Sequence, residues 1–340
     1  MDLGENEKKN TLLRYYDNVR YFAAIMVFTW HFISRFTRTT LWYWSHGPSH
    51  YLLQGINGKF GVIVFCVVLG YFAAKSGRKK GSLAKYTLNR YIQFALMGVF
   101  VNTLYLTVDL FNVFPNKSIA VAQVIQSGLL LSDDIFPAFW CMKLFLLGGV
   151  ICYANKKYEV PTEICLMEIL GFLLIGKYLY YDGIWITFIL MGSLMDEINE
   201  NPHVRKILQN RYAQLCMLLA VFCLFKRPMC QKTFFIQAVC AVAIFLILRN
   251  NEMLARWCSN RSLAKVGGSY MGFYLVHLVS YNVVCMLLYG YRESLDGMRL
   301  IIVYVVSLAV CVAAGYVVNE LLNKGSSKIS AKVFQVLKME

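Results

Sequence analysis

The sequence predicts an all-α polytopic membrane protein with about ten transmembrane helices and both termini in the cytoplasm. Of its 340 residues, 58% are hydrophobic and only 16% are charged, and the mean hydropathy is +0.51. Apolar runs of about 20 residues, the length that crosses a bilayer as a helix, recur along the whole chain. A lipid-facing β-barrel would show short alternating segments instead.

The apolar segments that we expect to cross the membrane follow one another with short loops between them. They lie at about 16–36, 57–76, 85–108, 136–154, 161–180, 184–198, 211–225, 233–249, 269–290 and 298–322. The stretch Ser118–Leu131 is apolar but too short for a full crossing, so we expect an interfacial or re-entrant helix there. No stretch has the length of an ordinary soluble domain, so a single transmembrane domain is expected over 1–340, with cytoplasmic tails at 1–14 and 323–340.

The distribution of positive charge predicts the orientation. The net charge of +15 would suit a nucleic-acid-binding protein. However, Lys and Arg cluster in the short loops, and roughly twice as many fall on the side of the N-terminus as on the opposite side. This positive-inside pattern predicts cytoplasmic termini and an even number of spans. It argues against a nucleic-acid partner, and some basic loops are expected to contact anionic membrane lipids.

The cysteines and the short motifs give no sign of a metal or a resident cofactor. The eleven cysteines lie mostly within apolar segments and form no CxxC pair, so we expect small buried hydrophobic side chains rather than disulfides or metal ligands. The chain contains no Walker A loop, no GxGxxG and no HExxH motif. No permanently bound cofactor or metal is therefore predicted.

The first span carries a polar stripe that includes a histidine. Side chains spaced by three or four residues share one face of a helix. The stripe comprises Asp17, Arg20, Ala24, Val27, His31 and Arg35. An ionisable side chain in a membrane segment is energetically expensive and by default marks a functional site, so the stripe should face the protein interior or an aqueous cavity. A structural polar seam that pairs helices is the alternative interpretation.

Helix geometry separates the two ends of this stripe. His31 should lie roughly 22 Å from the inner membrane boundary, in the outer half of the hydrocarbon core. Asp17 should lie roughly 21 Å from His31 along the same helix, too far to orient its imidazole. Because Asp17 and Arg20 stand at i and i+3, we expect them to form an ion pair near the inner mouth.

Four stretches, in order along the chain, resemble the acyltransferase 3 family of membrane acyltransferases. The opening stretch, YYDNVRYFAAIMVFTWHF, resembles the first helix of that family, and Asp17, Arg20 and His31 fall on matching positions. The next, GKFGVIVFCVVLGYFAAKS, resembles the second span, with Leu69-Gly70-Tyr71 in place of Ser-Gly-Phe.

The other two stretches resemble later parts of the same family. In YTLNRYIQFA, Arg90 matches the first of two arginines that open the third span, and Gln93 stands where the second would be. The stretch GGSYMGFYLVHLV resembles a late Ser…Tyr-Leu-x-His segment, matched by Ser269, Tyr274, Leu275 and His277. A weaker match places Trp140 at a family tryptophan. The resemblance covers about residues 13 to 320.

The resemblance implies acyl transfer, usually of acetyl, from cytoplasmic acyl-coenzyme A to a hydroxyl of a bacterial surface polysaccharide or its lipid-linked precursor. It implies an enzyme of the bacterial inner membrane. His31 would be the catalytic residue, either as a general base or as the carrier of a transient acyl-imidazole. Arg90 would bind the phosphates of coenzyme A, whereas its position alone also suits a snorkelling anchor. Asp17, Arg20, Trp140, Ser269, Tyr274 and His277 would support the site.

Two other classes of function remain open at the level of the sequence. A transporter or flippase of a glycan precursor or small solute would use His31 as a proton-coupling group. The absence of a visible internal repeat weighs against it. A non-catalytic membrane partner in polysaccharide assembly is the third class. For His277 itself, the alternative interpretation is an ordinary hydrogen-bonded histidine between helices.

Overall fold

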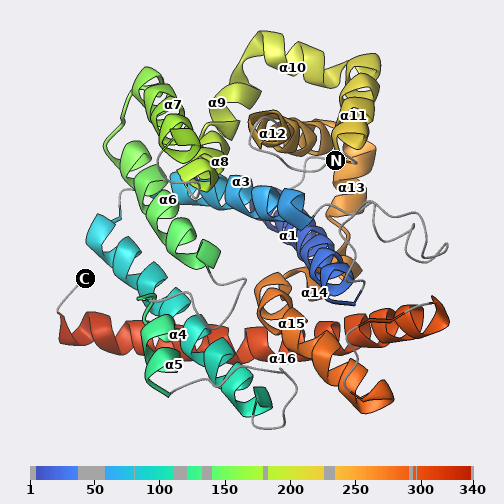
Figure 1. The fold of residues 1–340 in the computed structure, drawn as a ribbon. Helices are drawn as coiled ribbons and strands as arrows, with labels where there is room; N and C mark the ends of the chain where they lie inside the picture. Colours follow the sequence, from blue (N-terminus) through green and yellow to red (C-terminus); the bar gives the residue numbers. More distant parts are fainter. Residues whose placement is uncertain are drawn as a thin grey trace. The chain divides into compact units, whose positions relative to one another are not determined.

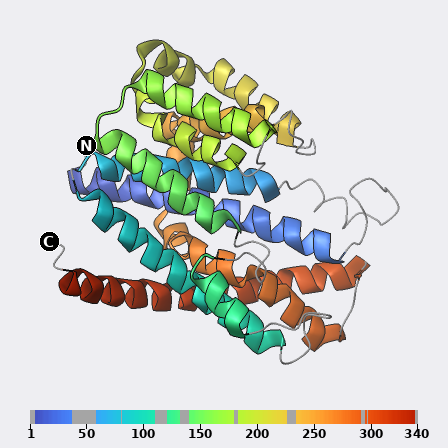
Figure 2. The same cartoon turned by 60° about the vertical axis from the view of Figure 1, so that its left-hand side comes forward.

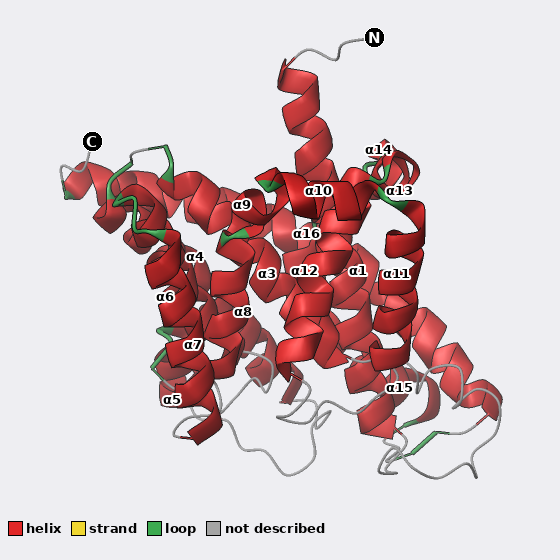
Figure 3. Cartoon of the chain, turned by 90° about the horizontal axis from the view of Figure 1, so that it is seen from above, coloured by secondary structure: helices red, strands yellow, loops and turns green. Residues whose placement is uncertain are grey.

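The described part of the chain is all-helical, as the sequence predicts (Figures 1 and 3). The computed structural model describes residues 5–36, 58–79, 81–109, 121–131, 140–178, 183–225, 234–290, 294–295 and 297–337, and no strand occurs within these ranges. The first half contains α1 (Glu5–Phe36), α3 (Gly58–Gly77), α4 (Leu83–Asp109), α5 (Val121–Gly128), α6 (Trp140–Lys157) and α7 (Thr162–Tyr178). The second half contains α8 (Gly183–Ser193), α9 (Met195–Glu200), α10 (Pro202–Gln209), α11 (Arg211–Phe225), α12 (Phe234–Asn250), α13 (Glu252–Cys258), α14 (Arg261–Gly267), α15 (Tyr270–Tyr289) and α16 (Gly297–Val336).

Four of the described helices are long and apolar enough to cross a membrane. They are α3, α4, α15 and α16. Each of the segments expected to span coincides largely with a helix, although the sixth is divided at Leu194 into α8 and α9. The membrane character of the chain is therefore supported, whereas the count of ten spans and the cytoplasmic location of both termini stay predictions.

The helices divide into two compact units, each assembled from segments distant in sequence. The first unit comprises Met1–Ala23, Lys59–Tyr86 and Leu144–Gly268, and the second comprises Ala24–Gly58, Thr87–Lys143 and Ser269–Glu340. α1, α4 and α6 each supply residues to both units. The expectation of a single domain stays a prediction.

Close packing of α3 on α8 organises the first unit. A Cβ atom added at Gly70 would overlap the carbonyl oxygen of Ile189, and one added at Gly192 would overlap that of Val67. Small residues that allow two backbones to approach are the usual device for packing helices in a membrane, where the hydrophobic effect between helices is weak. These two glycines therefore let α3 and α8 meet backbone to backbone.

A network of charged side chains ties four parts of the first unit together. Asp196 of α9 accepts hydrogen bonds from Arg78, just after α3, at 2.9 Å and from Arg249 of α12 at 3.0 Å. The neighbouring Glu197 accepts one from Arg78 at 3.0 Å and another from Lys156 of α6. The sequence marks Arg78 only as part of a basic loop, and the structure adds this pairing role.

The second unit is built around the crossing of α15 and α16 (Figure 1). A Cβ at Gly272 of α15 would overlap the carbonyl oxygen of Gly315 of α16, so the two helices touch through their backbones. The short helix expected within Ser118–Leu131 is α5, and it packs on α4, where a Cβ at Gly128 would lie 2.6 Å from Cγ2 of Val99. Its eight residues confirm that it is too short to cross a bilayer.

Both expected tails contain helix in their described residues. α1 starts at Glu5, well before the first span, and α16 continues beyond Leu322 to Val336 (Figure 2). Residues 323–336 contain no proline and can extend the preceding turns, since propagation of a helix is far easier than its nucleation. An ion pair between Lys324 and Glu320, 3.5 Å apart at i and i+4, spans the junction.

Candidate active site

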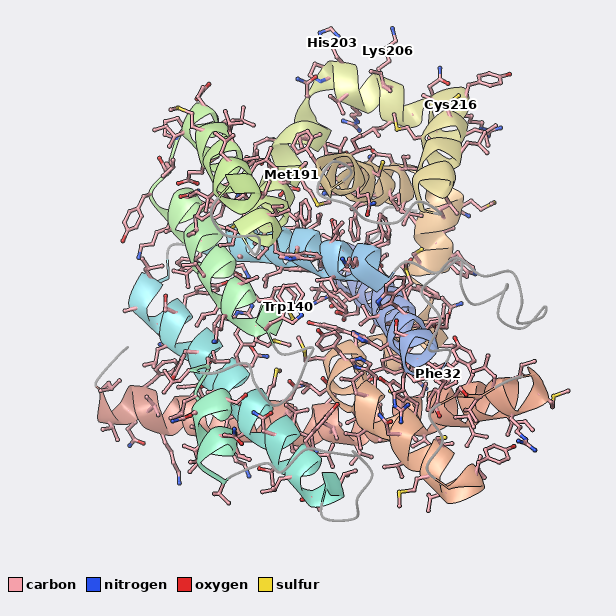
Figure 4. All side chains as sticks on the ribbon, viewed as in Figure 1. Phe32, Trp140, Met191, His203, Lys206 and Cys216 are labelled. Carbon is pink, nitrogen blue, oxygen red and sulfur yellow. The ribbon has the colours of Figure 1, made fainter. Side chains whose placement is uncertain are left out.

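The C-terminal half of α1 is packed on α15 and α16 by a cluster of aromatic rings in the second unit. Phe28, Phe32 and Phe36 follow one another at four-residue intervals, share one helix face and are fully buried. Their rings lie 5.7–6.1 Å from that of Tyr281 of α15. The rings of Phe28 and Phe32 also lie 5.6 and 5.2 Å from that of Tyr304 of α16. Figure 4 labels Phe32 on α1.

Polar contacts fix the rotation and height of α1 on the same helices. The hydroxyls of Thr29 and Tyr304 are 2.9 Å apart. Arg35 donates from Nε to Oδ1 of Asn282 on α15 at 3.1 Å. The backbone N–H of Leu295 donates to the carbonyl of Phe36 at 3.0 Å. Because hydrogen bonds are directional, these contacts specify the rotation of α1 more closely than aromatic packing alone.

This packing brings His31 of α1 to His277 of α15. The centroids of the two imidazole rings are 5.3 Å apart, and their planes are inclined by 43°. His31 is partly exposed, whereas His277 is 1% exposed. His31 is therefore the accessible member of the pair, and His277 is buried behind it. The sequence singles out both histidines but does not pair them.

Tyr274 holds His277 in place from one turn earlier on α15. Nδ1 of His277 forms a hydrogen bond with the backbone carbonyl of Tyr274. Since a carbonyl oxygen can only accept, Nδ1 carries the hydrogen, and in the neutral ring Nε2 holds a lone pair. The ring of Tyr274 lies 5.3 Å from that of His277, and its hydroxyl is 3.3 Å from Sγ of Cys141.

Ser269 and Trp140 are placed in the second unit with the two histidines. Ser269 is buried at the start of α15, and its carbonyl accepts a hydrogen bond from Phe273 at 3.0 Å. By helical rise it lies roughly 12 Å from His277, so its place is the far end of the same helix. Trp140 is the first residue of α6 and is partly exposed (Figure 4).

Arg90 also belongs to the second unit and has a specific neighbour. It lies in α4, roughly two turns from the start of the helix, and is partly exposed. Its Nη1 donates a hydrogen bond to Oε1 of Gln93 at 2.9 Å. The glutamine that replaces the second family arginine therefore contacts the first.

Asp17 and Arg20 form the ion pair that their spacing predicts. Nη2 of Arg20 is 2.6 Å from Oδ1 of Asp17, and the guanidinium lies 5.0 Å from the ring centroid of Phe72. Both residues belong to the first unit, whereas His31 belongs to the second. The structure thus gathers His31, His277 and Tyr274, and leaves Asp17 and Arg20 as a separate pair.

Sequence analysis missed several residues that position the two histidines. Tyr281 lies four residues after His277 and so on the same face of α15, a spacing that was available in the sequence. Cys141, Asn282 and Tyr304 carry no comparable signal, because each acquires its role through a partner distant in the chain. Within the described part of the chain, no group of three or more His, Cys, Asp and Glu side chains can hold a metal ion.

The comparison with protein families agrees with the motifs. A model of the acyltransferase 3 family, described as an acyltransferase domain, matches residues 13–318, nearly the whole chain. No curated protein and no solved structure is significantly similar to it. Both histidines, Tyr274, Arg90 and the Asp17–Arg20 pair lie within the matched range. The chain therefore belongs to the acyltransferase 3 family and is a membrane acyltransferase.

Proposed function

We propose that this protein is an O-acyltransferase of the bacterial inner membrane. In this proposal it transfers an acyl group, acetyl as the first candidate, from acyl-coenzyme A to a hydroxyl of a surface polysaccharide or its lipid-linked precursor. The family supplies the reaction class. The observation that carries the proposal is a partly exposed His31 held against a buried His277. Partial exposure gives a reacting group access to substrate, and the tight packing of α1 fixes its direction.

His31 performs the chemistry in one of two ways. As a general base, it takes the proton of the acceptor hydroxyl while the oxygen attacks the thioester carbonyl; the carbon–sulfur bond then breaks, and the coenzyme A thiolate leaves and takes up a proton. As a nucleophile, a ring nitrogen first takes the acyl group from the thioester and then passes it to the hydroxyl. Both routes require a neutral imidazole with an accessible lone pair.

Arg90 supplies the donor site in this proposal. Acyl-coenzyme A carries several phosphates, and a guanidinium binds phosphate through two parallel N–H groups. The hydrogen bond to Gln93 occupies Nη1 of Arg90 and limits the directions in which the guanidinium can point. Gln93 thus acts in this site by orienting a single arginine, where the family pattern has two.

The decisive experiment compares His31→Ala with His203→Ala in purified protein reconstituted into liposomes. His203 lies on the exposed surface of α10 in the first unit and serves as the matched control (Figure 4). Transfer of radiolabelled acetyl from acetyl-coenzyme A to a glycan extract is measured, with the acyl mass difference on envelope glycans as a second readout. His31→Ala should lower the rate about 10²–10⁴-fold, as for loss of a general base, and His203→Ala should leave it unchanged. Near-normal turnover of His31→Ala would refute the proposal.

A further inference from the structure

We propose that His277 is the proton acceptor behind His31 and fixes the tautomer in which His31 reacts. The inference rests on the proposed function, in which His31 is the group that meets the substrate. His277 would then be a positioning residue, since it acts through His31. The ordinary alternative for a buried histidine in a membrane helix is a structural hydrogen bond between or within helices.

The distance between the two rings allows proton exchange once they are turned toward each other. The rings are inclined by 43° with centroids 5.3 Å apart, and no hydrogen bond joins them in this orientation. A rotation that points two ring nitrogens at each other brings them to about 3 Å, the length of a hydrogen bond. The hydrogen bond of Nδ1 to the carbonyl of Tyr274 keeps the lone pair of His277 on Nε2, the far side of its ring. An N–H of His31 directed at that lone pair leaves the other nitrogen of His31 free to act on substrate.

A second imidazole stands beside His31 where many acid–base pairs have a carboxylate. Among the described side chains of the second unit, Glu320 of α16 is the one carboxylate, and it is 49% exposed and paired with Lys324. In many acid–base pairs a carboxylate orients the histidine and stabilises its positive charge. Here the neighbouring ring is His277, which can take the proton itself and share the charge.

The proposed step balances in protons and bonds. The acceptor O–H bond breaks as its proton moves to the free nitrogen of His31, and the proton on the other nitrogen of His31 moves to Nε2 of His277. His277 is then an imidazolium whose Nδ1–H still donates to Tyr274, and His31 remains neutral. When the coenzyme A thiolate leaves, it takes the proton from the substrate-facing nitrogen of His31. The proton on Nε2 of His277 then returns to the other nitrogen of His31.

Two variants at residue 277 separate this role from a structural one. His277→Asn keeps an amide N–H near the position of Nδ1, so the bond to the Tyr274 carbonyl can survive while the acceptor at Nε2 is lost. We expect kcat to fall about 10²-fold, with the KM for acetyl-coenzyme A and the thermal unfolding temperature unchanged. His277→Gln places an amide oxygen near Nε2, which can orient His31 without accepting its proton, so part of the lost kcat should return.

A double-mutant comparison and an isotope measurement complete the test. The double variant His31→Ala, His277→Asn should be no slower than His31→Ala alone, because the two residues act as one unit. In single-turnover reactions of the unaltered protein, the rate should depend on the deuterium fraction of the solvent with a quadratic curve, since two protons move together. Each of three results would overturn the inference. They are an unchanged kcat in His277→Asn, losses of kcat that add in the double variant, and a linear dependence of the rate on the deuterium fraction.

The outcomes also separate this inference from the proposed function. If His31→Ala is inactive while His277→Asn turns over normally, His31 stands alone as the base or nucleophile and only the role of His277 fails. If His31→Ala itself keeps turnover, the proposed function fails with it. Should His277→Asn and His277→Gln both prove unstable, the isotope measurement on the unaltered protein decides the point without them.

Discussion

Single residues near the candidate site acquire their chemistry from one or two neighbours. Gln93 turns from a missing family arginine into a hydrogen-bond acceptor for Arg90, and Tyr274 determines through its carbonyl which nitrogen of His277 holds a hydrogen. Arg35, the last member of the polar stripe on α1, is used to dock the helix on Asn282. One stripe thus contains both the histidine that we propose for the chemistry, His31, and the arginine that docks the helix, Arg35.

At this scale we predict that Arg90→Ala weakens donor binding about 10–100-fold, as expected when a charge-assisted contact to phosphate is lost. Arg90→Lys should weaken it less, because it keeps the charge but not the two-pronged geometry. Donor affinity is measured by titration of acetyl-coenzyme A into the purified protein. Arg205→Ala, on the exposed surface of α10, is the control. Affinity that is unchanged in Arg90→Ala would exclude a phosphate role.

Pairs of helices are held by two different devices. α3 and α8 meet through Gly70 and Gly192, where the backbones touch, and α15 and α16 meet through Gly272 and Gly315 in the same manner. The C-terminal half of α1 instead packs through large rings and directional hydrogen bonds. Backbone contacts leave no room for adjustment, whereas ring packing holds α1 on α15 and α16 through side chains.

For the helix contacts, we predict that Gly192→Leu disrupts packing of α3 on α8, because its Cβ would overlap the carbonyl oxygen of Val67. Overpacking of this kind typically costs about 1–3 kcal/mol and here meets rigid backbone. Gly171→Leu in α7 is the matched control, since a Cβ there has no atom within 4 Å. The thermal unfolding temperature in detergent should fall markedly for Gly192→Leu and change little for Gly171→Leu. Equal unfolding temperatures of the two variants would contradict this packing.

The charge network of the first unit should also be measurable. Asp196 neutralises Arg78 and Arg249 together, so Asp196→Asn leaves two cations without their shared carboxylate. Given the partial exposure of these groups, we expect a loss of about 1–3 kcal/mol in the free energy of unfolding. Glu200→Gln, on an exposed carboxylate of the same helix, should change little. A smaller effect of Asp196→Asn at high salt would identify the contribution as electrostatic.

For the whole molecule, the composition predicts insertion into a membrane and the charge distribution predicts the orientation. The excess of Lys and Arg in alternate loops predicts that the N-terminus and the C-terminus lie on the same, cytoplasmic side. Single cysteines introduced near each end should react with a membrane-impermeant maleimide only after the cells are permeabilised. This is measured in a variant without native cysteines that is first shown to be active. Labelling of either end in intact cells would overturn the orientation.

Some features of this protein depend on residues close together in the chain, and others depend on contacts between distant segments. The sequence alone determined the all-helical membrane class, the approximate place of the long apolar helices, the short helix α5 and the Asp17–Arg20 ion pair. Each of these depends on residues close together in the chain, through apolar run length or the three- and four-residue spacing of a helix. Composition and motifs also sufficed to identify the family that the residues 13–318 match.

Only the tertiary structure decided which helices meet, and therefore what His31 faces. His277, Asn282 and Tyr304 come from α15 and α16, far along the chain from α1, and Asp196 is 118 residues from Arg78. Membrane helices are apolar on most sides, so their hydrophobic pattern does not tell a protein-facing side from a lipid-facing one. Their pairing is chosen by the fit of glycines, rings and a few hydrogen bonds, and that fit exists only once the helices are packed.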